Sequence, residues 1–118
     1  MQAWLMALLS ILLSSAGQLL IKQGLNLVQR PGLPAFAYLV AALTNLQVVS
    51  GLAAYGLGAI IWLLALRQSA LSQMYPLVSL SYVLVAAGSV LLLGESLPPG
   101  RIAGLAVIIL GVILVARS

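Results

Sequence analysis

Charge is almost absent from this chain, and this restricts its fold more than any other feature of the sequence. Its 118 residues include five cations and one acid, and 64% of them are hydrophobic. Soluble domains carry charge on about 25% of their residues, so a fold surrounded by water is excluded. A helix needs roughly 20 apolar residues to cross a bilayer, so the chain has room for four such helices with short loops.

Apolar runs divide the chain into four expected spans and one shorter helix. The run after Pro34 holds about ten residues, which is too short to span and is typical of an interfacial or re-entrant helix. Beginning the second span at Pro34 instead leaves no loop before the run that ends at Leu66. We therefore predict an all-α membrane protein, one domain of four transmembrane helices. The expected spans are residues 2–21, 46–66, 73–93 and 102–116, with the interfacial helix at 34–44.

The residue types that are missing exclude most enzyme chemistry. The chain has no Cys and no His, and Glu95 is its single acid. Metal sites built on His or Cys, Ser-His-Asp triads and paired-carboxylate mechanisms all need residues that are absent here. We therefore expect no enzyme, no metal and no cofactor. The scattered cations form no nucleic-acid patch, but they suit anionic lipid head groups or a phosphorylated substrate.

Polar side chains run along one side of the first span. They lie four residues apart: Ser10, Ser14, Gln18 and Lys22. Each such step advances about 40° around a helix, so the four form one slowly winding stripe. Polar groups in a membrane face protein, water or a ligand, and Gln18 with Lys22 is predicted to hold a polar or anionic group. The alternative is helix packing for the serines and a lysine that only extends to the interface.

A second polar face is expected on the third span. Its members recur at helical spacing: Ser72, Tyr75, Ser79, Tyr82 and Ser89. Tyr75 alone would suit an interfacial anchor, but Tyr82 lies two turns deeper, where a hydroxyl needs a partner. Pro76 also releases a backbone carbonyl there. Two polar faces on different spans predict a shared cavity.

Glycines seven residues apart predict close helix packing. Gly104 and Gly111 share a face of the fourth span, and Gly51 and Gly58 form a similar pair in the second. Small residues let another helix approach closely. For Gly104 and Gly111, contact within the monomer and contact in a dimer remain equal alternatives.

The few charges are expected at the two ends of the bundle. Glu95 falls on the same side as Lys22 and Arg101, and we predict that it forms an ion pair with Arg101 or with Lys22. The cations divide two against three between the ends, which is too small a difference to fix orientation by the positive-inside rule. Single and dual topology therefore both remain open.

Several segments together resemble the short, four-span members of the drug/metabolite transporter superfamily. They are Ser14-Ser15-Ala16-Gly17-Gln18 with Lys22, Trp62-Leu63-Leu64-Ala65-Leu66, Tyr75-Pro76-Leu77-Val78-Ser79-Leu80 and Gly94-Glu95. The chain is most similar to the paired small subunits proposed to flip 4-amino-4-deoxy-L-arabinose-phosphoundecaprenol. The resemblance implies a multi-pass protein of the bacterial inner membrane that contacts membrane lipids and forms a homodimer, or a heterodimer with a similar small subunit.

The chain is also similar to the small multidrug resistance proteins in size and in its paired glycines. Those exporters carry an essential glutamate at the position of Ser14, and without it proton exchange for a cationic drug has no carrier. The resemblance therefore implies a flippase, or a flippase subunit, for a polyprenyl-phosphate-linked sugar. Lys22 and Arg30 would hold the phosphate, and the head-group path would be lined by Gln18, Ser14, Tyr75, Ser79 and Tyr82. A small-solute exporter and a non-transporting scaffold subunit are the alternatives.

Overall fold

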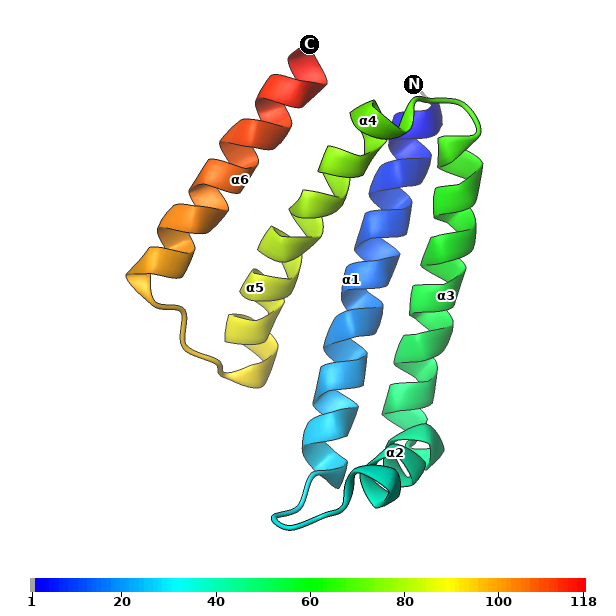
Figure 1. Cartoon of the computed structure of the whole chain (residues 1–118), viewed down its shortest axis with the longest axis vertical. Helices are drawn as coiled ribbons and strands as arrows, with labels where there is room; N and C mark the ends of the chain where they lie inside the picture. Colours follow the sequence, from blue (N-terminus) through cyan, green and yellow to red (C-terminus); the bar gives the residue numbers. More distant parts are fainter. Residues whose placement is uncertain (1) are drawn as a thin grey trace.

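The computed structural model describes residues 2–118, and its regular secondary structure in this range is all helical, with both chain ends at one end of the molecule (Figure 1). Four helical segments are long and apolar enough to cross a membrane, which confirms the predicted all-α fold. The elements are α1 (Gln2–Val28), α2 (Ala35–Thr44), α3 (Leu46–Leu66), α4 (Leu71–Met74), the 3₁₀ helix η1 (Tyr75–Ser79), α5 (Leu80–Leu93) and α6 (Pro99–Arg117). Segments α4, η1 and α5 together make the third span.

Helix α1 is longer than the sequence predicted, because it continues to Val28 instead of ending at Ile21. Nothing before Pro31 breaks a helix, so the polar residues after Ile21 remain helical. Gly24 also lies tightly against the start of α3, where an added Cβ would come 2.8 Å from the side-chain oxygen of Asn45. The polar connection is thereby reduced to residues 29–34.

Helices α2 and α3 begin and end close to the predicted residues. Asn45 separates them in an extended conformation, and its side chain accepts a hydrogen bond of 3.1 Å from the Val48 amide. Such a cap satisfies one of the free N–H groups at a helix start. The short apolar α2 therefore ends where the second span begins.

Helices α1 and α3 pack closely through glycine. A Cβ added to Gly17 would lie 2.6 Å from the Gly51 carbonyl oxygen, and one added to Gly51 would lie 2.6 Å from the Gly17 carbonyl oxygen. A Cβ on Gly58 would lie 2.6 Å from the Ser14 hydroxyl. Backbones can approach this closely only where side chains are absent. The predicted close approach at Gly51 and Gly58 is therefore made within the chain, against α1.

The buried apolar core lies at the end of the bundle that holds the chain termini. Its members come from α1, α3, the third span and α6: Ala3, Ala7, Ile11, Ala65, Met74, Leu77 and Val112. Helix α6 packs mainly against η1 and α5, and Ile108 adds to the core from α6. An added Cβ at Gly104 or Gly111 would meet nothing within 4 Å. These two glycines therefore make no packing contact within the chain.

Candidate functional site

A cavity of about 410 Å³ separates α1 and α3 from η1 and α5. Its wall combines aliphatic and aromatic side chains with hydroxyl groups and one amide, and none of its lining residues is charged. The polar and aromatic lining residues are Ser10, Ser14, Ser15, Gln18, Tyr55, Trp62, Tyr75, Ser81 and Tyr82. The cavity contains no acid, although hydroxyl groups and one amide surround it. The predicted shared cavity between the first and third spans is therefore present.

The serines of α1 differ in what their hydroxyl groups bind. Ser10 donates a hydrogen bond of 2.6 Å to the Gly58 carbonyl oxygen, and Ser14 donates one of 2.7 Å to the Ser10 carbonyl oxygen. Ser15 is only 4% exposed, and its hydroxyl has no hydrogen-bond partner. A buried polar group left without a partner costs about 1–3 kcal/mol. Among the described residues, Ser15 thus has a buried hydrogen-bonding group that is unused beside the cavity.

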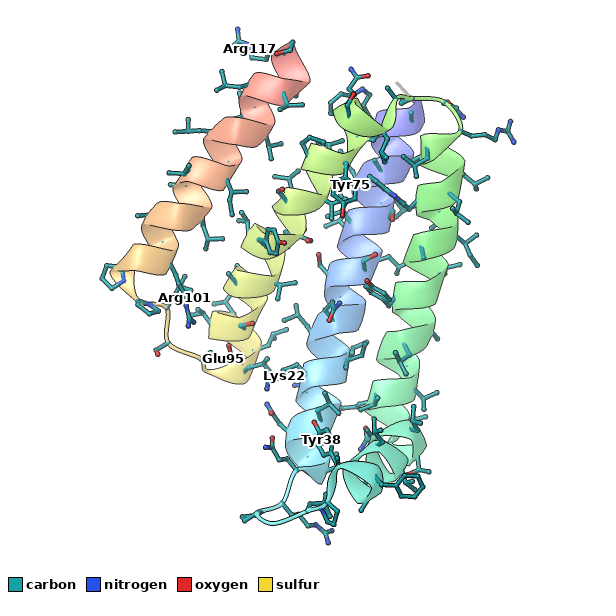
Figure 2. The ribbon with its side chains drawn as sticks, in the orientation of Figure 1. Lys22, Tyr38, Tyr75, Glu95, Arg101 and Arg117 are labelled. Atoms are coloured by element: carbon teal, nitrogen blue, oxygen red, sulfur yellow. The ribbon has the colours of Figure 1, made fainter. Side chains whose placement is uncertain are left out.

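Tyrosines make the open side of the cavity. Tyr75 and Tyr82 are each 62% exposed, and Tyr55 is 44% exposed. Figure 2 shows Tyr75 between α5 and α1, nearer the end that holds the termini. Because these rings line the cavity and also face outward, the cavity opens at the side of the bundle. In a membrane that side faces the lipid or a partner protein.

The third span presents a different serine from the one the sequence favoured. Ser81 lines the cavity, whereas Ser79 does not. Residues 75–79 form a 3₁₀ helix, which turns about 120° per residue instead of about 100°, so Ser79 rotates roughly 80° away from its expected direction. Val78 then lies on the same face of the 3₁₀ helix as Tyr75, one turn later. Ser81 lies on the side of α5 that lines the cavity. The predicted positions of Tyr75 and Tyr82 on the cavity are unaffected.

The predicted cationic residues lie outside this cavity. Lys22 is exposed one turn beyond Gln18, and Arg30 is exposed in the loop after α1. Neither residue lines this cavity or the smaller one described below. Lys22 lies at a level along the molecule similar to that of Glu95, while Arg117 marks the opposite end (Figure 2). The structure therefore brings neutral groups together inside the span and leaves the cations nearer its boundary.

A second cavity of about 170 Å³ lies where α5 ends and α6 begins. We call it the boundary cavity, and its polar lining residues are Tyr82, Ser89, Glu95, Ser96 and Arg101. Tyr82 and Val85 line both cavities. The predicted ion pair is not formed, because within residues 2–118 no carboxylate oxygen lies within 4.0 Å of a Lys or Arg nitrogen. Glu95 and Arg101 instead share one cavity without touching.

Glycine fixes the direction in which Glu95 leaves α5. Gly94 has a φ of 69°, in the left-handed region that side chains disfavour. This conformation lets the Glu95 amide donate a hydrogen bond of 3.1 Å to the Ser89 carbonyl oxygen, closing the helix end in the usual way. Within the part of the chain that the structure describes, no group of His, Cys, Asp or Glu could hold a metal ion.

The comparisons with known proteins decide the family. A protein of Enterobacter sp. strain 638, described as a probable 4-amino-4-deoxy-L-arabinose-phosphoundecaprenol flippase subunit ArnF, is 39% identical over 98% of this chain and 94% of its own. The chain belongs to the ArnF family. ArnF relatives from Erwinia tasmaniensis and Aeromonas hydrophila are 37% and 36% identical, over 94% and 98% of this chain and 91% and 80% of their own. No family model and no solved structure matches.

Membership of the ArnF family confirms the resemblance to flippase subunits. With its four spanning segments, this ArnF relative is a multi-pass protein of the bacterial inner membrane. Sequence reasoning missed several of its cavity residues, notably Ser15, Tyr55 and Trp62. Tyr55 and Trp62 are seven residues apart, so their common helix face was a signal that could have placed both on the cavity.

Proposed function

We propose that this chain is a subunit of a flippase that moves a polyprenyl-phosphate-linked aminosugar across the bacterial inner membrane. Its ArnF relatives are described as probable flippase subunits for this type of substrate. The observation that supports it most is the uncharged, hydroxyl-rich cavity inside the spans, open at the side of the bundle.

A lipid-linked sugar presents a specific problem to a membrane. Its tail is apolar and stays in the lipid, whereas each sugar hydroxyl that enters hydrocarbon without a partner costs several kcal/mol. The cavity supplies partners such as the Gln18 amide and the Ser15, Ser81 and Tyr82 hydroxyls. Its open side lets the tail remain outside while the head group is inside. A closed cavity would require the whole lipid to enter.

The cations are proposed to hold the phosphate when the head group is near the boundary. Lys22 follows Gln18 by one turn, and its exposed side chain can reach the interface. Arg30 lies farther along the chain, in the loop before α2, so we assign it a weaker role in attracting the anionic lipid. In contrast, the cavity wall offers no carboxylate, which argues against the proton-coupled export of cationic drugs.

A partner is proposed to pack against α6. The relatives are described as subunits, and Gly104 and Gly111 have no contact within the chain. A helix of a second copy, or of a similar small subunit, could approach there closely.

Transport by the purified protein, with any subunit that copurifies, tests this proposal. Vesicles would contain the polyprenyl-phosphate-linked aminosugar, and a membrane-impermeant amine reagent would report which leaflet holds it. We expect Gln18→Leu to slow flipping about tenfold, the equivalent of losing 1.4 kcal/mol, and Lys22→Ala to slow it as well. Ser50→Ala is the matched control, because Ser50 is exposed and bonds only to its own helix. Equal rates for all variants at equal expression would reject the assignment.

A further inference from the structure

The boundary cavity contains both signs of charge, unlike the larger cavity above it. The Glu95 carboxylate comes from the loop after α5, and the Arg101 guanidinium comes from the first turns of α6. Ser89, Ser96 and Tyr82 add hydroxyl groups between them. Figure 2 shows the side chains of Glu95 and Arg101 in the same region, between the ends of α5 and α6.

Both charged residues are attached to well-defined backbone. Glu95 follows the left-handed Gly94, and its amide is bonded to the Ser89 carbonyl oxygen. The Arg101 amide donates a hydrogen bond of 3.0 Å to the carbonyl oxygen of Pro98, which is followed by a second proline. Prolines restrict the loop because their φ is fixed. The two charged side chains therefore start from ordered backbone on either side of the boundary cavity.

Neither helix stability nor an ion pair with Glu95 explains why a cation lies at the start of α6, at Arg101. A cation in the first turns of a helix lies at the unfavourable end of the helix dipole, at a cost of about 0.3–1 kcal/mol. An ion pair with Glu95 would offset this cost, yet the two side chains are not within 4.0 Å of each other. Both side chains are exposed at the end of the bundle, so each is free to bind a charged group from outside the chain. A ligand with one charge of each sign would give both of them a partner.

We infer that the boundary cavity binds a zwitterionic head group, with its phosphate against Arg101 and its ammonium against Glu95. The inference rests on the proposed function and adds a recognition site to it. Arginine binds phosphate oxygens through paired N–H donors, and a carboxylate accepts hydrogen bonds from an ammonium. Two kinds of lipid have this chemistry, a polyprenyl phosphate that carries an aminosugar and an aminophospholipid such as phosphatidylethanolamine.

The position of the boundary cavity suits a first binding step. Tyr82 and Val85 form part of both walls, so a head group in the boundary cavity lies next to the larger one. Val90 and Ile102 are 39% and 53% exposed nearby, and they offer apolar surface to a lipid tail. A zwitterion recognised here would need to move only past Tyr82 to reach the neutral cavity.

Binding measured by native mass spectrometry tests the inference on the purified protein with any subunit that copurifies. The probes are the lipid-linked aminosugar, its N-acetylated form, phosphatidylethanolamine and phosphatidylglycerol. We expect an amine-bearing lipid to bind about tenfold or more tightly than its amine-free counterpart, since a charged hydrogen bond is worth about 1.5–3 kcal/mol. Glu95→Gln should abolish this preference and leave the N-acetylated form unchanged. Arg101→Gln should weaken all phosphate-bearing probes.

The pattern of binding identifies the source of the ligand. Preference for the lipid-linked aminosugar over its N-acetylated form identifies the transported substrate as the ligand. Preference for phosphatidylethanolamine over phosphatidylglycerol identifies a membrane lipid as the ligand. Either result supports the inference. Equal binding of amine-bearing and amine-free probes to the native protein would overturn it. So would an undiminished preference in Glu95→Gln. Arg117→Gln, at the far end of α6, is the control and should bind as the native protein does.

A charge exchange separates a ligand site from a structural ion pair. If Glu95 and Arg101 serve only each other, the double variant Glu95→Arg with Arg101→Glu should behave as the native protein in binding and thermal stability. If they hold a zwitterion whose orientation is fixed by its tail, the exchange should not restore selective binding. Selective binding without flipping would contradict the proposed function alone, while normal flipping with selectivity retained in Glu95→Gln would contradict this inference alone.

Discussion

The hydroxyl of Ser10 donates a hydrogen bond of 2.6 Å to the carbonyl oxygen of Gly58. This bond joins α1 to α3 at the wall of the larger cavity, at a point where glycine allows the backbones to approach. The bond gives Ser10 a structural role, which agrees with the helix-packing alternative for the serines of α1. The neighbouring Ser15, whose hydroxyl has no partner, is left to interact with whatever occupies the cavity.

Replacing Ser10 should lower stability more than transport. Ser10→Ala removes the bond to Gly58, and interhelical hydrogen bonds in membranes contribute about 0.6 kcal/mol on average. We expect a small fall in the thermal unfolding temperature in detergent, with the flipping rate nearly unchanged. Ser15→Ala should show the reverse, with slower flipping and equal or higher stability. Identical behaviour of the two variants would contradict their separate roles.

The glycine contact between α1 and α3 should be intolerant of added atoms. Gly51→Ala places a methyl group about where the Gly17 carbonyl oxygen leaves no room, and overpacking of this kind costs about 1–3 kcal/mol. Gly56→Ala is a matched control on the same helix, because a Cβ there meets nothing within 4 Å. Thermal unfolding should distinguish the two, and similar midpoints would show that the helices do not pack in this way.

Single cysteines can test the rotation caused by the 3₁₀ helix. The chain has no cysteine of its own, so Ser81→Cys and Ser79→Cys each introduce one unique thiol. We expect lipid-linked substrate to protect the thiol at position 81 from a maleimide, because this position lines the cavity. The thiol at position 79 should react at the same rate with or without substrate. Protection at position 79 alone would favour a regular α-helix through Pro76.

The outward glycines of α6 should affect assembly without affecting the fold of the chain. Gly104→Leu and Gly111→Leu add bulk to positions without neighbours, so thermal unfolding of the isolated chain should change little. We expect both variants to lose copies of the chain or copurifying subunits in native mass spectrometry. Ala106→Leu, also exposed on α6, is the control. Unchanged assembly would place the partner interface elsewhere.

Local signals determined how far the fold could be predicted from the sequence. Pro34 and Asn45 mark the limits of α2, so this helix and the start of α3 were predicted closely. The end of α1 was missed because the polar residues after Ile21 contain no helix breaker. The cavity was expected from two polar stripes, but the change to a 3₁₀ helix at Tyr75 is a tertiary effect that helical spacing does not reveal.

Of the residues predicted to bind substrate, some line the larger cavity and others lie outside it. The larger cavity is lined by four of the predicted residues, Ser14, Gln18, Tyr75 and Tyr82. Their helical spacing puts them on the faces of the first and third spans that meet there. Ser15 escaped notice because it lies beside the stripe, not within it. The expected Glu95–Arg101 pair is not formed because the distance between a loop residue and a residue of the next helix depends on the backbone path between them, which composition does not specify.

Helix α6 is packed against the rest of the protein through the middle of its length. Ile108 and Val112 join the buried core, whereas residues 98–104 are all exposed. A tilt of the helix about these contacts displaces both of its ends, and the arm that begins at Pro99 is the longer one. Arg101 is on that long arm. A movement that leaves the core intact can therefore change the gap between Arg101 and Glu95, and with it the width of the entrance that a head group would pass.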